Sequence, residues 1–146
     1  MPSSGETLLI VDDDPAIQLV LADRLEALGY QVITAADGRT GLALLDQASP
    51  QLVLLDLQLP DMDGLEVLKA MRQREAEVTV VIITAYGTVE RTVQAMREGA
   101  YNFITKPFEP DHIALTVQRA LERERLKREV ALLSEAVGEP YRQVVG

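Results

Sequence analysis

The chain has 146 residues, of which 47% are hydrophobic and only 4% aromatic, so its core must be built from aliphatic side chains. Its 23 acidic and 14 basic residues give a net charge of -9, which disfavours nucleic-acid binding because cationic groups dominate contacts to phosphates. The absence of cysteine excludes disulfides, thiolate metal sites and cysteine nucleophiles. The first six residues lack a signal-peptide pattern and no apolar run could span a bilayer, so we expect a cytoplasmic protein with no membrane partner.

Five short apolar runs rich in branched side chains alternate with segments of helical spacing. The runs cover residues 7–11, 31–35, 51–55, 78–83 and 102–105. The helical stripes between them are Ile17, Val20, Leu21, Leu25 and Leu28; Leu42, Leu45 and Ala48; Leu65, Leu68 and Met71; and Val89, Val93, Met96 and Ala100. Such alternation is typical of a parallel sheet whose two faces are both covered by helices. The sequence therefore predicts the α/β class, with a doubly wound five-stranded parallel sheet.

The C-terminal part of the chain predicts one extended helix, because residues 111–137 contain neither glycine nor proline. Its first part carries an apolar stripe suited to packing on the sheet. Farther on, Leu126, Val130, Leu133 and Val137 are spaced four, three and four residues apart, and we call them the C-terminal seam. This spacing is typical of a coiled coil, so we expect a homodimer through this helix. The alternative is a frayed, solvated tail, since the seam covers only two heptads.

Polar residues lie at equivalent places, where the predicted strands end. Asp12 and Asp13 follow the first strand, Asp56 the third, Thr84 the fourth and Lys106 the fifth. Right-handed crossovers bring these strand ends to one edge of the sheet. Three converging carboxylates repel unless a cation joins them, and an oxygen-rich site with open positions suits Mg²⁺. A carboxylate there can also serve as a nucleophile that forms an acyl phosphate, and Asp56 is the candidate.

Several of the acidic residues have a purely structural interpretation. Asp14 precedes Pro15 and is typical of a helix N-cap with proline at the first helical position. Asp61 and Asp63 are better explained by turn and cap chemistry than by metal binding. The single histidine, His112, is explained as a surface residue in the first turn of the last helix.

Four segments together resemble the receiver domain of two-component response regulators. They are LLIVDDDP (8–15), LVLLDLQLPDMDG (52–64), VVIITAYGT (80–88) and FITKPF (103–108), in the family's order and spacing. The resemblance covers about residues 6–125 and implies a flavodoxin-like sheet with strand order 2-1-3-4-5 followed by an extended helix.

The resemblance also implies roles for individual residues. Asp56 is expected to be the phosphoacceptor, and Thr84 and Lys106 to contact the phosphoryl group. Asp12, Asp13, Asp56 and the backbone carbonyl of Gln58 are expected to hold Mg²⁺. The Lys106–Pro107 bond is expected to be cis. Phe103 occupies the position of the switch aromatic that works with Thr84, and as a phenylalanine it has no hydroxyl to donate.

The segment TAYGTVERTVQAMREGAYNFITKPF (84–108) resembles more narrowly the nitrogen-regulation class of receivers, found in sigma-54-dependent activators. This likeness implies a receiver domain at residues 1–125 and, at residues 126–146, a helical linker toward an AAA+ ATPase. No phosphate-binding GxxxxGK[ST] loop is present, so ATP hydrolysis by that route is not expected.

The function predicted is a phosphorylation-controlled module that accepts a phosphoryl group on Asp56 from a sensor histidine kinase and switches the output of a transcription activator. A free-standing phosphatase is disfavoured because such enzymes need an acid two residues after the nucleophile, where this chain has Gln58. We therefore expect no enzyme acting on an independent substrate. A degenerate receiver that only mediates dimerisation is the remaining alternative.

Overall fold

The computed structural model describes residues 5–74, 77–85 and 89–137, with backbone only for 134–137. The strands are β1 (Thr7–Val11), β2 (Gln31–Ala35), β3 (Leu52–Asp56), β4 (Thr79–Thr84) and β5 (Asn102–Thr105). The helices are α1 (Pro15–Glu26), α2 (Gly38–Ala48), α3 (Gly64–Arg74), α4 (Val89–Arg97) and α5 (Pro110–Val137). All strand pairings are parallel, in the order β2-β1-β3-β4-β5. The predicted fold class and strand order are confirmed.

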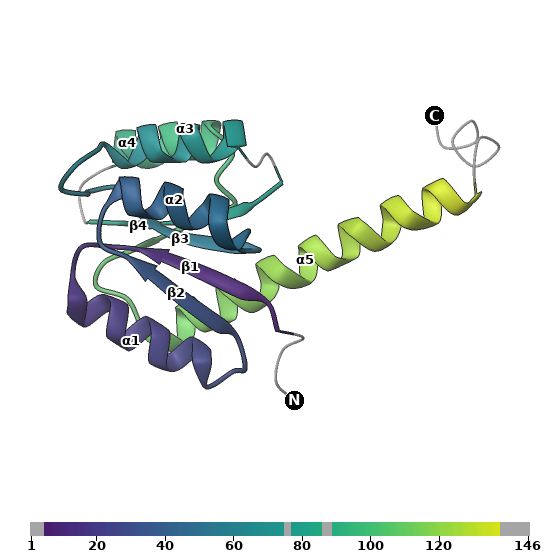
Figure 1. The fold of residues 1–146 in the computed structure, drawn as a ribbon, viewed down its shortest axis with the longest axis horizontal. Coiled ribbons are helices and arrows are strands. Elements are labelled where there is room, and N and C mark those ends of the chain that lie inside the picture. Colours follow the sequence, from purple (N-terminus) through teal and green to yellow (C-terminus); the bar gives the residue numbers. More distant parts are fainter. Residues whose placement is uncertain (1–4, 75–76, 86–88, 138–146) are drawn as a thin grey trace.

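Two helical layers cover the sheet, with α2, α3 and α4 on one face and α1 and α5 on the other (Figure 1). Side chains alternate between them, so that Leu9 and Val11 of β1 join the first core and Leu8 and Ile10 the second. Every residue of β3 and β4 is buried. Full burial of each such aliphatic side chain contributes about 1.5–3 kcal/mol, which fixes the central strands and the residues that end them.

The helix starts are set by aspartates. Asp14 accepts from the N–H of Ala16 at 2.9 Å and caps α1, and Asp63 accepts from the N–H of Leu65 at 2.8 Å at the start of α3. Both predicted cap assignments are confirmed. Asp37 caps α2 by accepting from the N–H of Thr40 at 2.7 Å. Asp61, whose predicted role was also structural, adds to this cap across the fold by accepting from the N–H groups of Gly38 and Arg39 at 2.8 and 3.0 Å.

The orientation of α4 differs from the expected one. Its residues facing the sheet are Thr92 and Ala95, whereas the predicted apolar stripe turns outward, with Val89 72% exposed. Val93 and Met96 are also exposed, and only Ala100, beyond the helix end, is buried. Helical periodicity states which residues share a face but not which face the sheet accepts. Beneath α4 the sheet accepts small side chains.

The first part of α5 packs on the sheet through the predicted stripe of Ile113, Val117, Ala120 and Leu121. Beyond Leu121 the helix keeps a contact with the domain, where Arg123 lies over the Tyr101 ring, and its C-terminal part extends away from the domain (Figure 1). There Leu126, Val130 and Leu133 of the C-terminal seam are exposed, while the side chain of Val137 and residues 138–146 lie outside the described part. Among the described residues, no helix is both long and apolar enough to cross a lipid bilayer.

Candidate phosphoacceptor site

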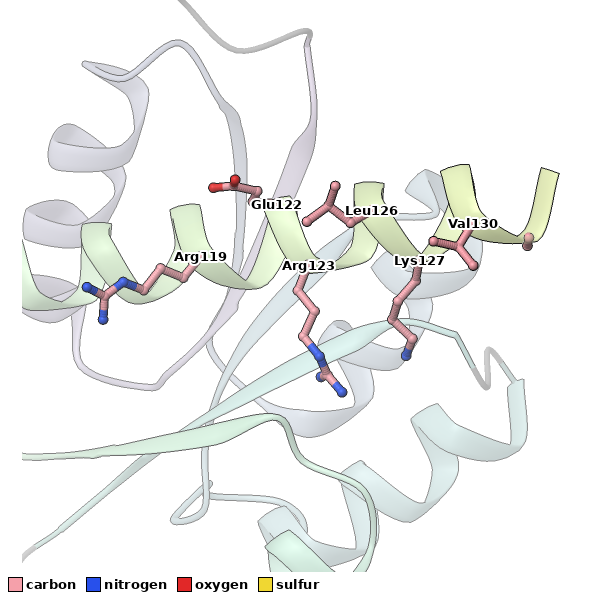
Figure 2. Close-up of a pocket in the computed structure, with 7 residues that line it drawn as sticks. Arg119, Glu122, Arg123, Leu126, Lys127 and Val130 are labelled. Carbon is pink, nitrogen blue, oxygen red and sulfur yellow. The ribbon is translucent and has the colours of Figure 1, made fainter. Parts of the chain in front are cut away.

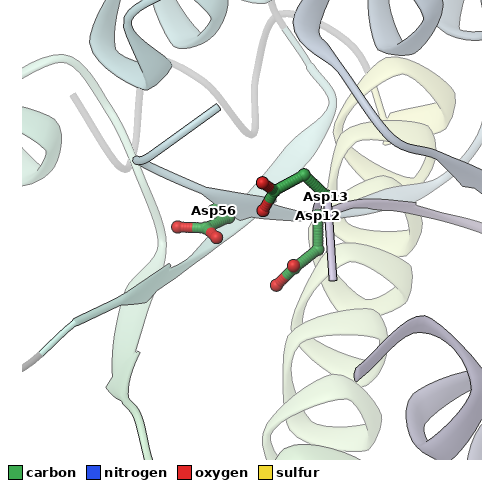
Figure 3. Close-up of side chains that lie close together, drawn as sticks. All are labelled: Asp12, Asp13 and Asp56. Atoms are coloured by element: carbon green, nitrogen blue, oxygen red, sulfur yellow. The ribbon is translucent and has the colours of Figure 1, made fainter. Parts of the chain in front are cut away.

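Three carboxylates meet at the carboxyl edge of the sheet. Strands β1 and β3 are neighbours with Val11 paired to Leu55, so the residues after each pair lie side by side. One carboxylate oxygen from each of Asp12, Asp13 and Asp56 lies within 4.8 Å of the others (Figure 3). Asp12 and Asp56 are buried and Asp13 is exposed. The site is thus a partly buried acidic cluster that opens to solvent on the Asp13 side.

Lys106 reaches this cluster from the loop after β5. Its Nζ lies 2.9 Å from Asp56 Oδ2 and 3.0 Å from Asp12 Oδ2. Burial alone would lower the pKa of Lys106, but the hydrogen bond to Asp56 and the contact with Asp12 outweigh it, so the pKa is raised. The backbone N–H of Lys106 donates to the carbonyl of Thr84 at 2.8 Å, and the cis bond predicted between Lys106 and Pro107 is present.

Each oxygen of Asp56 has a distinct partner. Oδ2 accepts from Lys106, and Oδ1 accepts from the backbone N–H of Gln58 at 2.9 Å. These contacts fix the carboxylate at the end of β3. Asp56 was expected to follow the strand, whereas in the structure it is the last residue of the strand. The charge of one ammonium is thereby shared between two buried carboxylates.

Asp12 is the most enclosed member of the cluster. Its Oδ1 accepts from the N–H of Asp14 at 2.8 Å. Its Oδ2 is buried and makes no hydrogen bond within the part of the chain that the structure describes, although Lys106 Nζ approaches it as an ion pair. Burial raises the pKa of Asp12, against the opposing effects of the Asp14 N–H and Lys106. This buried oxygen thus has the Lys106 ammonium as its one close partner among the described residues, and a cation could take a place beside it.

The two predicted switch residues lie on the strands beyond β3, namely Thr84 on β4 and Phe103 on β5. Thr84 is buried at the end of β4, one residue beyond the Ile83 that pairs with Asp56. Its hydroxyl donates to the carbonyl of Ala85 at 3.4 Å. Phe103 lies on the edge strand β5 and is 43% exposed. The structure therefore brings together Asp12, Asp13, Asp56 and Lys106, with Gln58 joined through its N–H.

Two contributors were missed at the sequence level. Gln18 of α1 donates from Nε2 to the carbonyls of Asp12 and Ala35 at 2.6 and 3.2 Å, which fastens the turn after β1. Arg91 of α4 donates to the carbonyl of Leu57, next to the acceptor. The only signal for Gln18 is a polar residue beside the apolar stripe of its helix. Arg91 gives no signal, because a single arginine next to Glu90 in the first turn of a helix is common on protein surfaces.

Comparison with known proteins agrees with this geometry. The sequence profile of the response regulator receiver domain matches residues 8–118. The chain belongs to this family. As a receiver domain it is 39% identical over 130 residues to the regulatory protein AtoC of Escherichia coli (strain K12), covering 89% of this chain and 28% of AtoC. It is 42% identical over 130 residues to the nitrogen assimilation regulatory protein NtrX of Azorhizobium caulinodans, covering 88% of this chain and 29% of that protein.

Solved structures give the same result. The receiver domain superposes on crystalline NtrX from Brucella abortus with a TM-score of 0.87 at 39% identity, over 92% of this chain and 30% of that one. A CheY-like receiver domain protein from Methanospirillum hungatei superposes with a TM-score of 0.82 at 32% identity, over 85% and 99% of the two chains. The predicted resemblance to nitrogen-regulation receivers is confirmed. The chain spans less than a third of the length of AtoC and NtrX.

Proposed function

We propose that Asp56 accepts a phosphoryl group from the phosphohistidine of a sensor histidine kinase. The observation that carries this proposal is the arrangement of Asp56, which is buried at a strand end with Oδ1 held by the Gln58 N–H and Oδ2 by Lys106. In the transfer, a carboxylate oxygen of Asp56 forms a bond to phosphorus as the bond from phosphorus to the histidine nitrogen breaks. The electron pair of that bond returns to the imidazole.

The residues around Asp56 have the charges that such a transfer needs. Lys106 already contacts the acceptor, and its ammonium neutralises a phosphoryl oxygen once the carboxylate has reacted. The hydroxyl of Thr84, on the neighbouring strand, is the proposed second contact to the phosphoryl group. With Phe103 on the edge strand beyond it, a rearrangement of Thr84 is transmitted toward the exposed faces of α4 and β5.

The acidic cluster fits Mg²⁺. The buried Asp12 Oδ2 lacks a hydrogen bond among the described residues, and one lysine cannot balance three carboxylates. We propose Asp12, Asp13 and Asp56 as side-chain ligands and the carbonyl of Gln58 as a backbone ligand. When bound, Mg²⁺ supplies positive charge to the phosphoryl oxygens. We expect no turnover of an independent substrate, because Gln58 offers no acid two residues after the acceptor.

We further propose that two copies pair through α5. Leu126 and Val130 line a groove on the helix that leaves the domain (Figure 2). Arg123, which would otherwise face its counterpart across the seam, lies over the Tyr101 ring at 5.3 Å. In a parallel pair the heptad positions place Glu122 of one copy opposite Lys127 of the other, an attractive charge contact. A dimer would therefore avoid repulsion between the two Arg123 side chains and would gain attraction between Glu122 and Lys127 beside the seam.

The likeness to AtoC and NtrX supports a further proposal about the parent protein. Residues 1–125 would be the receiver and 126–146 the linker toward an AAA+ domain of a sigma-54-dependent activator. Phosphorylation of Asp56 would then change the dimer and output surfaces. Identities of 39% and 42% that extend over most of this chain support this subclass.

The acceptor assignment is tested with a small acyl phosphate and Mg²⁺, followed by intact-mass measurement. Wild type should gain one phosphoryl group, and chelation of the metal should prevent it. Asp56→Asn should gain none, whereas Asp61→Asn, an acid outside the cluster, should react as wild type does. An unmodified wild type, or equal modification of Asp56→Asn, would refute Asp56 as the acceptor and favour a dimerisation module that is never phosphorylated.

A further inference from the structure

A second set of contacts reaches the acceptor from α4. Arg91, in the first turn of that helix, donates from Nη1 to Asp63 Oδ2 at 2.9 Å and from Nη2 to Asp63 Oδ1 at 2.7 Å. The same Nη2 donates to the carbonyl of Leu57 at 3.0 Å. The planar guanidinium thus grips both ends of the segment 57–63, which we call the acceptor loop.

One peptide group lies between this guanidinium and the acceptor. The carbonyl of Leu57 and the N–H of Gln58 belong to the same planar unit. The carbonyl accepts from Arg91 and also from the N–H of Gly64 at 3.0 Å, and the N–H donates to Asp56 Oδ1 at 2.9 Å. A hydrogen bond to the carbonyl polarises the amide and strengthens its N–H as a donor. Arg91 is therefore linked to the acceptor carboxylate indirectly, through two hydrogen bonds to one planar peptide group.

The packing of α4 makes this contact important for the helix. Only Thr92 and Ala95 are buried among its residues, and both are small. Its larger apolar side chains point outward, so little apolar burial holds α4 on the sheet. An exposed ion pair alone would contribute little, and the side chains of Arg91 and Asp63 are 33% and 43% exposed. The forked geometry and the third bond to Leu57 distinguish this pair from such a surface contact.

We propose that Arg91 is a positioning residue that couples the Asp56 carboxylate to α4 through the Leu57–Gln58 peptide. The proposal rests on the proposed function in one respect, namely that phosphorylation of Asp56 is the event transmitted. Because coupling between two sites is reciprocal, a partner that binds α4 would also alter the acceptor loop.

The test measures amide hydrogen exchange in the full, unphosphorylated chain. In Arg91→Gln, the Gln58 amide and the amides of α4 should exchange several-fold faster than in wild type. Arg97→Gln is the matched control, because it removes the same charge from the exposed last turn of α4. It should leave both sets of rates unchanged. A folded Arg91→Gln with wild-type exchange at Gln58 would overturn the proposal.

A second variant guards against a misfolded first one. Asp63→Asn keeps an oxygen to accept from Leu65 at the start of α3 but removes the charge that Arg91 grips. It should raise exchange at Gln58 less than Arg91→Gln does, and the double variant should not add the two effects. Additive effects would count against a shared fork.

A small acyl phosphate then separates this proposal from the phosphoacceptor assignment. If wild type is phosphorylated, exchange in α4 should change, and the change should be smaller in Arg91→Gln. An equal response in both proteins would overturn the coupling while leaving the acceptor intact. Failure to phosphorylate would refute the acceptor without affecting the Gln58 exchange measurement.

Discussion

Lys106 Nζ lies 2.9 Å from Asp56 Oδ2, although the two residues stand 50 positions apart in the chain. The contact exists because β3 and β5, which lie on either side of β4, both end at the same edge of one parallel sheet. In the structure the Lys106 ammonium is the positive charge beside the Asp56 carboxylate, and it also contacts Asp12. It therefore competes with a metal ion for the same negative charge.

Replacement of the lysine should reveal this competition. Lys106→Met removes the ammonium but keeps an apolar stem, so the acidic cluster becomes more negative. Binding of Mg²⁺ should tighten by about tenfold, or about 1.4 kcal/mol, while phosphorylation slows. Calorimetry suits the measurement because the chain has no tryptophan to report on the site. Lys69→Met, an exposed lysine of α3, should bind Mg²⁺ as wild type does. Weaker binding in Lys106→Met would contradict the argument.

The start of α3 should not tolerate a side chain. A Cβ on Gly64 would lie 2.4 Å from Leu57 Cα and 2.6 Å from its carbonyl oxygen, both backbone atoms. Gly64→Ala should lower the free energy of unfolding by about 3 kcal/mol, measured by urea denaturation. Gly41→Ala is the matched comparison, because the three atoms nearest its Cβ would be side-chain atoms of Val11, the closest at 2.9 Å, rather than backbone atoms. Gly41→Ala should lower the free energy of unfolding clearly less than Gly64→Ala does. Equal losses would show that the acceptor loop can shift to make room for a Cβ on Gly64.

Stability should depend on Asp63 in acid. The hydrogen bond from Arg91 lowers the pKa of Asp63 below its ordinary value. A carboxyl whose pKa is depressed by folding stabilises the fold fully above its unfolded pKa of about 3.9, and this stabilisation is lost as pH falls through the folded value. The difference in unfolding free energy between wild type and Asp63→Asn should therefore be constant near neutrality and shrink below about pH 4.

The comparison with a variant is needed because Asp12 acts in the opposite direction. Burial raises its pKa, so Asp12 favours the folded state as pH falls. Urea denaturation at several pH values checks the difference. A difference that does not change with pH would show that the charge of Asp63 adds nothing to folding.

The α5 extension should form a dimer that one seam residue controls. Leu133→Asp places a charge in the proposed interface and should convert the dimer to monomer in analytical ultracentrifugation. Leu132→Asp is the control, since Leu132 is as exposed as Leu133 but lies outside the seam. It should sediment as wild type does. A wild type that is monomeric at high concentration would instead support the solvated tail.

Much of the fold and the convergence of Asp12, Asp56 and Lys106 could be predicted from the sequence. Apolar runs and helical spacing determine a parallel sheet, and in such a sheet strand ends share one edge wherever they lie in the chain. The extent of α5 followed equally from the lack of glycine and proline between residues 111 and 137.

The contacts of Asp61 and Arg91 could not be predicted in the same way. Asp61 accepts from the first N–H group of α2 across 23 residues, and Asp63 accepts from Arg91 across 28 residues. No local sequence pattern encodes such pairings. They depend on the path of the acceptor loop. The outward face of α4 escaped prediction for a different reason, because its stripe has the spacing of a core face and only the room above the sheet decides its direction.

The unbroken course of α5 determines how motion travels through this protein. Its 28 residues form a rod about 42 Å long at 1.5 Å per residue, and only the first part is fastened to the sheet. With no glycine or proline between residues 111 and 137 to absorb a twist, a small tilt at the sheet becomes a displacement of several ångströms at the far end of the helix. A domain attached there would be displaced when the receiver changes conformation, without any contact between that domain and the receiver.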